Sequence, residues 1–154
     1  MGVNIGYVGI DHHHRDPYFA VASELDATVT AVCEPGRTVD VGNIAAMDER
    51  PDEITTEGQG VSDLVSGAAV YEDPHRLVAD DSVDVVWITY RSDETPAIID
   101  SAVENGVHVI SEKPIARTAS DLAEIADRAK EAGVTVSPTL YYRRNPVAMD
   151  LRDR

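Results

Sequence analysis

The stretch that decides the fold is Ala102–Pro114, which reads AVENGVHVISEKP. An amphipathic segment ends at Gly106, an apolar run continues to Ser111, and the triplet Glu112–Pro114 follows at once. This order predicts a helix, a tight turn and a buried parallel strand, because glycine commonly ends helices and short apolar runs fill parallel sheets. The triplet is therefore expected at the carboxyl end of a strand, where doubly wound sheets bind ligands.

Five further apolar runs of strand length alternate with segments that can form helices. Such alternation predicts an α/β fold, a doubly wound and mostly parallel sheet with helices on both faces. The six predicted strands are Val3–Val8, Thr28–Cys33, Ala69–Tyr71, Val83–Thr89, Val107–Ser111 and Thr135–Ser137.

Two helices are predicted with defined ends. One spans Ala119–Ala132, where Thr118 can cap the first turn, Asp121 stands three residues later, and Gly133 ends the helix. The other spans Pro96–Asn105, with its apolar residues on one face.

The turn after the first predicted strand reads GIDHHH over residues 9–14. A dinucleotide-binding turn uses three small residues, for tight turning, for close approach of backbone to diphosphate, and for packing of helix on strand. Only Gly9 is present, since Asp11 holds the second position and His14 the third. An ordinary strand-to-helix turn is the other interpretation. The predicted cofactor contacts in this turn are Gly9, Ile10, Asp11, His12 and His13.

The ends of two other strands add candidate cofactor contacts. Glu34 follows the second strand, about 20 residues after the turn, and is suited to accept hydrogen bonds from ribose hydroxyls. Arg37 lies nearby and could instead meet a 2′-phosphate. Thr89 and Tyr90 follow the fourth strand. These residues predict NAD or NADP as cofactor, with NAD slightly favoured.

The three adjacent histidines, residues 12–14, invite a metal-site hypothesis. Adjacent residues in a turn point in different directions, and neither a helical His-x-x-x-His spacing nor a cysteine pair accompanies them. No metal site is predicted. One imidazole donating a hydrogen bond to a phosphate or substrate is an intermediate hypothesis.

Charge and composition exclude several classes of function. The 154 residues include 13 basic and 28 acidic ones, a net charge of -15 with neutral histidines, and only two are Lys. This charge disfavours binding to nucleic acid or to an anionic membrane surface. The scarcity of Lys favours an acidic surface of halophile type, whose self-repulsion is screened by salt.

Length and apolar pattern predict one cytoplasmic domain over residues 1–140. No apolar run approaches the roughly 20 residues that span a bilayer, and no secretory leader pattern is present. Cys33 is the only cysteine and is expected to be a buried packing residue. Residues 37–67 indicate an irregular connection with a short helix over Val61–Ser66, and an uncovered sheet edge would allow a homo-oligomer.

The Glu112-Lys113-Pro114 tract resembles the AGKHVxxEKP tract of the glucose-fructose oxidoreductase, inositol dehydrogenase and rhizopine-catabolism (Gfo/Idh/MocA) family. The resemblance extends from the first strand through the fourth strand to a tail at residues 141–146. It implies a Rossmann domain that binds NAD or NADP. It also implies that Lys113 lies near nicotinamide and substrate and assists proton and hydride transfer, while Glu112 orients it. Pro114 restricts the turn and allows a cis peptide bond.

Three departures from the family pattern accompany the resemblance. Thr95 stands where the family places a histidine, and the first turn carries Asp11 and His14. Family members also have a second domain, which supplies the substrate pocket and a catalytic histidine, and residues 141–154 are expected to be only the start of the connection to it.

The leading hypothesis is therefore the NAD(P)-binding domain of an oxidoreductase that acts on a sugar, polyol or related hydroxyl substrate, and that is not catalytically complete alone. The alternative is a non-catalytic module that senses a nucleotide or binds another protein. A structural protein without a ligand is disfavoured by the retained Glu112-Lys113-Pro114 turn.

Overall fold

The computed structural model describes residues 2–10, 12, 14–37, 39, 65–140, 143 and 145–153. Six strands form one sheet in the order β3-β2-β1-β4-β5-β6, and every neighbouring pair is parallel. The predicted doubly wound parallel sheet is thereby confirmed. The strands are β1 Val3–Val8, β2 Ala27–Cys33, β3 Ala69–Tyr71, β4 Val85–Ile88, β5 His108–Ser111 and β6 Val136–Pro138.

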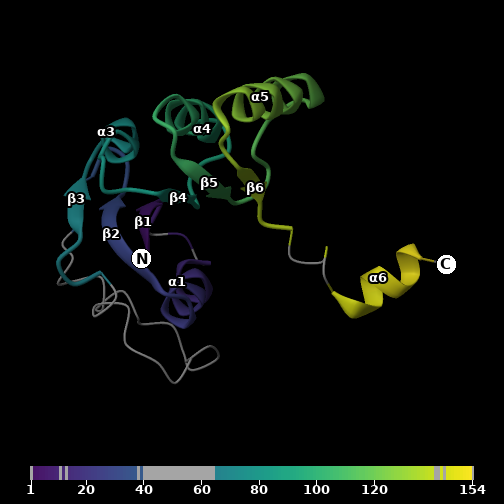
Figure 1. Ribbon diagram of the computed structural model, residues 1–154, viewed down its shortest axis with the longest axis horizontal. Coiled ribbons are helices and arrows are strands. Elements are labelled where there is room, and N and C mark those ends of the chain that lie inside the picture. Colours follow the sequence, from purple (N-terminus) through teal and green to yellow (C-terminus); the bar gives the residue numbers. More distant parts are fainter. Residues whose placement is uncertain are drawn as a thin grey trace.

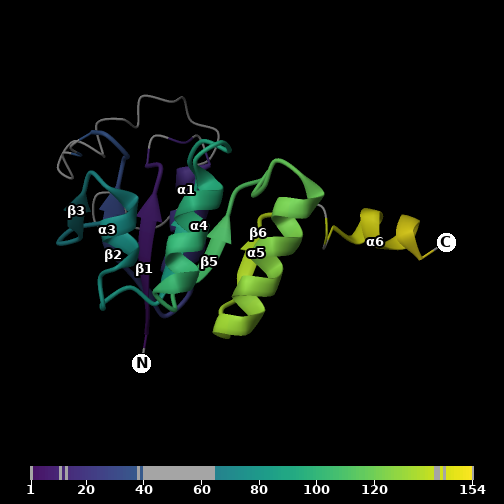
Figure 2. The same cartoon turned by 90° about the horizontal axis from the view of Figure 1, so that it is seen from above.

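The helices cover both faces of this sheet, as predicted (Figure 1). Helix α1 lies on one face, and α3, α4 and α5 lie together on the other; Figure 2 shows the latter three in front of the strands. Helix α6 follows β6 and lies beyond that edge of the sheet in both views. The helices are α1 Arg15–Glu24, α3 Pro74–Val78, α4 Thr95–Glu104, α5 Ala119–Ala132 and α6 Pro146–Arg152.

Helix α5 begins and ends at the residues that the sequence predicted. The Thr118 hydroxyl accepts the Asp121 amide at 3.1 Å, while the Asp121 carboxylate accepts the Thr118 amide at 3.2 Å, which completes a capping box. Gly133 ends the helix with a left-handed φ of 70°. Helix α4 begins one residue earlier than predicted, at Thr95.

The fourth strand is shorter than predicted because its first residues belong to a turn. The Val83 amide donates to the Asp80 carbonyl at 3.0 Å, so Val83 closes the turn that follows α3. The Asp84 amide donates to the Asn4 carbonyl at 3.0 Å, and the ladder of β4 starts at Val85.

The core has two apolar layers, one under each set of helices. Tyr7 and Phe19 anchor the layer beneath α1, with ring centroids 4.8 Å apart. Val8 and Ile99 belong to the layer beneath α3, α4 and α5. Pairing of β1 with β2 shifts by one residue at Thr30, which forms a bulge in β2. Because side chains alternate along a strand, β2 contributes to both layers.

Two further expectations concern single segments. Cys33 is fully buried and forms no disulfide, which confirms its packing role. The helix predicted over Val61–Ser66 falls mostly outside the described residues. Among the residues that the structure describes, no helix is both long and apolar enough to cross a membrane.

Candidate functional site

The site starts at the turn after β1, which Gly9 makes possible. Gly9 has a φ of 88°, and a Cβ at this position would lie 2.6 Å from the carbonyl oxygen of Thr89. The Gly9 amide donates to the Cys33 carbonyl at 2.9 Å, and the Thr89 hydroxyl donates to the Gly9 carbonyl at 2.6 Å. Only glycine permits this approach, so the ends of β1, β2 and β4 are held together at the carboxyl edge of the sheet.

Among the described residues at the start of α1, two amides are already bonded and one residue has no amide hydrogen to offer a phosphate. The His14 amide donates to the Nδ1 atom of His12 at 3.2 Å, and the Arg15 amide donates to the His12 carbonyl at 3.0 Å. Pro17, the third residue of the helix, has no N–H. A diphosphate at this helix start would therefore depend on side-chain donors as well as backbone.

Glu112 lies directly after β5 and is surrounded by hydrogen-bond donors. Its Oε1 atom accepts from Nδ1 of His14 at 2.8 Å and from the Tyr18 hydroxyl. Its Oε2 atom accepts from the Lys113 amide at 3.1 Å and from the Lys113 Nζ at 3.2 Å. Four hydrogen bonds thus use all the acceptor positions of this carboxylate, whose side chain is only 9% exposed.

These contacts settle the ionisation of Glu112 and Tyr18. Burial alone would raise the pKa of Glu112, but the hydrogen bonds from Tyr18, His14 and Lys113 outweigh it and lower that pKa to about 2. Burial, followed by the hydrogen bond to Glu112, raises the pKa of Tyr18 to about 12. At neutral pH a carboxylate anion therefore faces a protonated phenol.

Helix α1 supplies Tyr18 because of its spacing from His14. Residues four apart lie on the same side of a helix, so the His14 and Tyr18 rings both point to β5. Tyr18 also packs on Trp87 of β4, with ring centroids 4.6 Å apart. This apolar backing fixes the phenol beside Glu112.

A groove of about 890 Å³ opens beside this cluster. Lys113 is 52% exposed and presents its ammonium group there, next to the apolar surfaces of Pro17 and Leu140. The Lys113–Pro114 peptide bond is cis, as the sequence allowed. The groove is lined by His14, Pro17, Tyr18, Glu112, Lys113, Thr139, Leu140 and Arg143.

Other residues predicted at the site lie at the same edge but contribute differently. Ile10 is fully buried in the layer beneath α1, and Thr89 is 2% exposed with its hydroxyl bound inside, so both shape the turn. Glu34 is half-buried and forms an isolated antiparallel bridge with exposed Arg37. Burial, followed by the charges of Glu94 and Glu34, raises the pKa of Tyr90.

Two of the predicted contacts, Asp11 and His13, lie outside the described residues. Thr95, which stands in place of the family's histidine, is buried and does not line the groove. Its hydroxyl donates to the Arg91 carbonyl at 2.9 Å and fastens the start of α4. Within the described part of the chain, no three His, Cys, Asp or Glu side chains are grouped as metal ligands would be.

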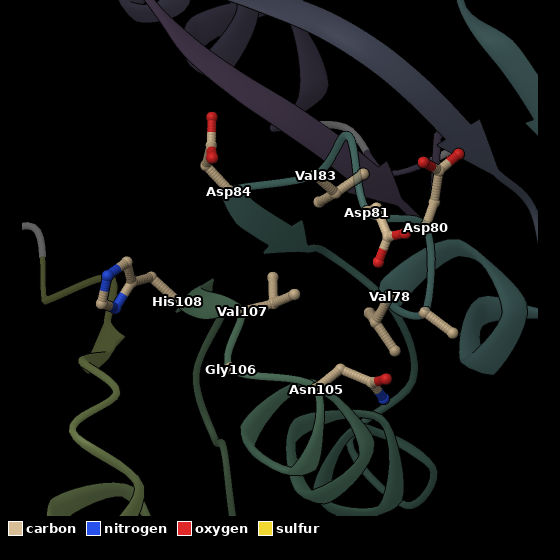
Figure 3. A pocket seen from close by; sticks show the side chains of 10 residues that line it. Val78, Asp80, Asp81, Val83, Asp84, Asn105, Gly106, Val107 and His108 are labelled. Carbon is tan, nitrogen blue, oxygen red and sulfur yellow. The ribbon is translucent and has the colours of Figure 1, made fainter.

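A second hollow, of about 340 Å³, lies at the opposite, amino edge of the sheet (Figure 3). Two of its three acidic side chains already serve the fold, since Asp80 accepts the Tyr71 hydroxyl and Asp84 accepts the Asn4 amide at 2.8 Å. His108 accepts the Thr135 amide at 3.0 Å through Nδ1. This hollow is remote from the turns after β1 and β5, which carry the predicted site residues.

A comparison with family models identifies the chain. The model described as "Oxidoreductase family, NAD-binding Rossmann fold" matches residues 4–140. The chain belongs to this family. Its NAD-binding Rossmann domain accordingly contains Gly9, Glu34 and the Glu112-Lys113-Pro114 turn within the matched residues.

Curated relatives of this NAD-binding domain are longer proteins. An inositol 2-dehydrogenase/D-chiro-inositol 3-dehydrogenase of Lactiplantibacillus plantarum is 32% identical over 133 residues, which are 85% of this chain and 31% of the relative. A D-xylose 1-dehydrogenase (NADP(+)) of Haloferax volcanii is 31% identical over 104 residues, 68% of this chain and 30% of the relative. The chain thus spans about a third of these relatives.

Solved structures show the same fold. A 3-ketoreductase from Actinomadura kijaniata, in complex with NADP and TDP-benzene, superposes with a TM-score of 0.75 at 18% identity, covering 99% of this chain and 42% of that one. A dehydrogenase from Chromobacterium violaceum in complex with NADH and UDP-GlcNAcA gives 0.73 at 21% identity, covering 99% and 39%.

Sequence reasoning missed five residues of the groove, of which Pro17 is one. Tyr18 could have been found from its four-residue spacing to His14, which predicts a shared helix face. Thr139, Leu140 and Arg143 follow β6. No motif marks Thr139 or Leu140, and Arg143 was included only in the family-like tail at residues 141–146. The sequence analysis treated His14 as a departure from the glycine pattern and as one of three adjacent histidines. It did not predict the contact with Glu112, which spans 98 positions.

Proposed function

We propose that this domain holds NAD or NADP along the carboxyl edge of its sheet for an oxidoreductase that acts on a sugar, polyol or related hydroxyl substrate. The observation that carries the proposal is the Glu112–Lys113 pair in the wall of the groove, with 3.2 Å between Oε2 and Nζ. Bound NAD(P) supplies the hydride acceptor or donor. Lys113 binds and orients the reacting oxygen, and Glu112 holds Lys113.

The residues present fit such a cofactor. The turn at Gly9 brings backbone to the ends of β1 and β4 without a side chain in between, as a diphosphate requires. Glu34 lies at the end of β2, where a ribose is bound in this fold. We assign His12 as an additional diphosphate ligand. Its Nδ1 atom accepts the His14 amide, so its Nε2 atom carries the proton that it donates.

Fluorescence titration with NADH and NADPH tests this function. We expect saturable binding that weakens in Lys113→Ala and in His12→Ala. The matched controls are Lys130→Ala, the other lysine of the chain, on α5, and His108→Ala, at the amino edge. Absence of binding for either cofactor at any salt concentration would overturn the proposal.

The preference between the two cofactors is proposed to lie with NAD. The carboxylate of Glu34 accepts ribose hydroxyls but repels a 2′-phosphate, whereas Arg37 is exposed beside it and attracts one. We expect Glu34→Ala to lose NADH affinity and to gain NADPH affinity relative to the unmodified chain. Equal effects on both cofactors would contradict a ribose contact.

We also propose where the protein acts, what it binds and how its chain is organised. The acidic charge supports a cytoplasmic protein with a salt-adapted surface, whose substrate is a small hydroxyl compound and not a nucleic acid or membrane. Residues 1–140 form the cofactor domain, and residues 141–154 lead from it towards substrate-binding parts. We also propose that an uncovered edge of the sheet, at β3 or β6, allows a homo-oligomer.

A second candidate function is a module that senses a nucleotide without catalysis. The occupied amides at the start of α1 favour it, since they weaken diphosphate binding. Cofactor titration separates the two functions. A sensor binds the oxidised and reduced forms differently and retains binding in Lys113→Ala, whereas the oxidoreductase domain depends on Lys113 for the nicotinamide end.

A further inference from the structure

The loop after β4 places an arginine next to the turn at Gly9. The Thr89 amide donates to the Val8 carbonyl at 2.8 Å, which ties this loop to the end of β1. A Cβ on Gly9 would lie 3.0 Å from the amide nitrogen of Tyr90, and Arg91 is the next residue. The chain runs from β1 to β2 on one side and from β4 to β5 on the other, so the ends of β1 and β4 flank the crevice where such sheets bind a diphosphate.

The backbone of Arg91 is fixed by the start of α4. Its carbonyl accepts the Thr95 amide at 3.0 Å and the Thr95 hydroxyl at 2.9 Å. The Glu94 amide donates to the same carbonyl at 3.1 Å. Thr95 is only 1% exposed, so water competes little for these bonds. The Arg91 side chain therefore extends from a fixed position beside the crevice.

Two carboxylates hold the guanidinium group of Arg91. Its Nε and Nη2 atoms donate to the two oxygens of Asp93 at 3.2 and 2.8 Å, and its Nη1 atom lies 3.5 Å from Oε1 of Glu94. The Arg91 side chain is 64% exposed and both carboxylates are 49% exposed. Exposed pairs of this kind contribute little free energy, because water and salt screen them. A diphosphate, which binds guanidinium in the same bidentate manner and carries more charge, can therefore replace Asp93.

A cationic donor suits this crevice because the described backbone at the start of α1 is largely occupied. The amides of His14 and Arg15 are bonded within the turn, and Pro17 has no N–H. The Lys113 ammonium group lies 3.2 Å from Glu112, after β5. Arg91 thus adds a positive charge where few backbone donors remain.

Asp93 keeps a cationic neighbour if Arg91 leaves it. The hydrogen bond from Arg91 lowers the pKa of Asp93 most, and the charge of Arg117 lowers it further. Exchange of partners therefore does not leave the carboxylate without a compensating charge.

We propose that Arg91 is a ligand of the cofactor diphosphate, and that Asp93 holds its guanidinium group in the free domain until the diphosphate replaces this carboxylate. The inference rests on the proposed function. Asp93 and the cofactor compete for the same N–H groups. Removal of the Asp93 charge should therefore strengthen cofactor binding, and removal of the guanidinium group should weaken it.

Fluorescence titration with NADH tests this exchange as a double-mutant cycle. Arg91→Gln should weaken NADH binding by roughly tenfold, as expected for the loss of hydrogen bonds between charged groups. Asp93→Asn should strengthen binding several-fold in the unmodified background and leave it unchanged in Arg91→Gln. Strengthening of equal size in both backgrounds would show that Asp93 only repels the cofactor, and would overturn the exchange.

Arg128 offers a matched control, because two carboxylates hold it as well. Its Nη1 and Nη2 atoms lie 2.8 Å from Asp100 and 3.0 Å from Glu104, on α4 and α5. Arg128→Gln should leave NADH binding unchanged, and a loss equal to that of Arg91→Gln would assign the effect to overall charge and overturn the proposal. Calorimetric titration with ADP-ribose should show the same loss in Arg91→Gln as NADH does. A loss confined to NADH would place Arg91 at the nicotinamide instead of the diphosphate.

Nitrogen-15 NMR of the arginine side chains gives a readout that needs no variant. Addition of ADP-ribose should shift the Nε resonance of Arg91 saturably and leave that of Arg128 unchanged. Binding of ADP-ribose without a shift at Arg91 would overturn the inference and leave the proposed cofactor function intact. Absence of NADH and NADPH binding to the unmodified chain at any salt concentration would instead defeat the proposed function, and this inference with it.

Discussion

Gly9 shows how a single residue determines the approach of two strand ends. Gly9→Ala places a Cβ 2.6 Å from the Thr89 carbonyl oxygen and also requires a φ of 88° from an L residue. Gly36→Ala shares the positive φ, at 75°, but meets no atom within 4 Å. We expect losses of about 1 kcal/mol for Gly36→Ala and clearly more, about 3 kcal/mol, for Gly9→Ala in urea unfolding. Equal losses would show that the contact with Thr89 is relaxed at no cost.

Glu112 couples stability to pH. Its pKa is about 2 in the folded chain, below the ordinary value near 4.5, because hydrogen bonds from Tyr18, His14 and Lys113 outweigh the opposing effect of burial. A lowered folded-state pKa stabilises the fold above pH 4.5, and this contribution is lost as pH falls towards 2. We expect Glu112→Gln to be less stable than the unmodified chain by about 1 kcal/mol at pH 6, after allowance for solvent screening of its exposed partners.

The check is the difference in unfolding free energy between the two chains at several pH values. The difference should shrink as pH falls from 4.5 to 2. The exposed residue Glu104, changed to Gln, is the control and should show little pH dependence. A difference for Glu112→Gln that stays constant over this window would mean that its hydrogen bonds do not favour the anion.

At the scale of the element, the capping box of α5 is the clearest test. Thr118→Ala removes the hydroxyl that accepts the Asp121 amide, and we expect a loss of about 1 kcal/mol. Ser120→Ala, at an exposed position in the first turn, should change stability by only a few tenths of a kcal/mol. Thermal unfolding of both variants measures the difference in stability. Similar losses of stability would show that the cap does not stabilise the helix.

Elements whose signals are local were predictable from the sequence. The bounds of α5 follow from Thr118 and Gly133, and the positions of Glu112 and Lys113 follow from the strand that precedes them. The bulge at Thr30 carries no sequence signal, because it depends on the pairing of β2 with β1. The Glu112–Lys113 contact was expected from the resemblance, but the donors His14 and Tyr18 were equally hidden, since only folding brings the start of α1 to the end of β5.

At the scale of the whole molecule, charge governs the response to salt. A net charge of -15 on one domain is self-repulsive, and the screening length falls from about 10 Å at 0.1 M salt to about 3 Å at 1 M. We expect the melting temperature to rise with KCl concentration. Glu124→Lys, at an exposed position of α5, should raise it at low salt and flatten the dependence. A melting temperature that KCl leaves unchanged would contradict a salt-adapted surface.

Because Cys33 is buried, the rate of its chemical labelling depends on how often the sheet opens. Burial, followed by the charges of Glu34 and Asp73, raises the pKa of this thiol to about 12, so the reactive thiolate is almost absent from the closed sheet. The rate of alkylation by iodoacetamide then measures how often β2 separates from the neighbouring strands. Because the Cys33 carbonyl binds the amide of Gly9, a dinucleotide seated on that turn should slow the labelling in proportion to its occupancy. The labelling rate of Cys33, in the centre of the sheet, would thus report cofactor binding at the carboxyl edge.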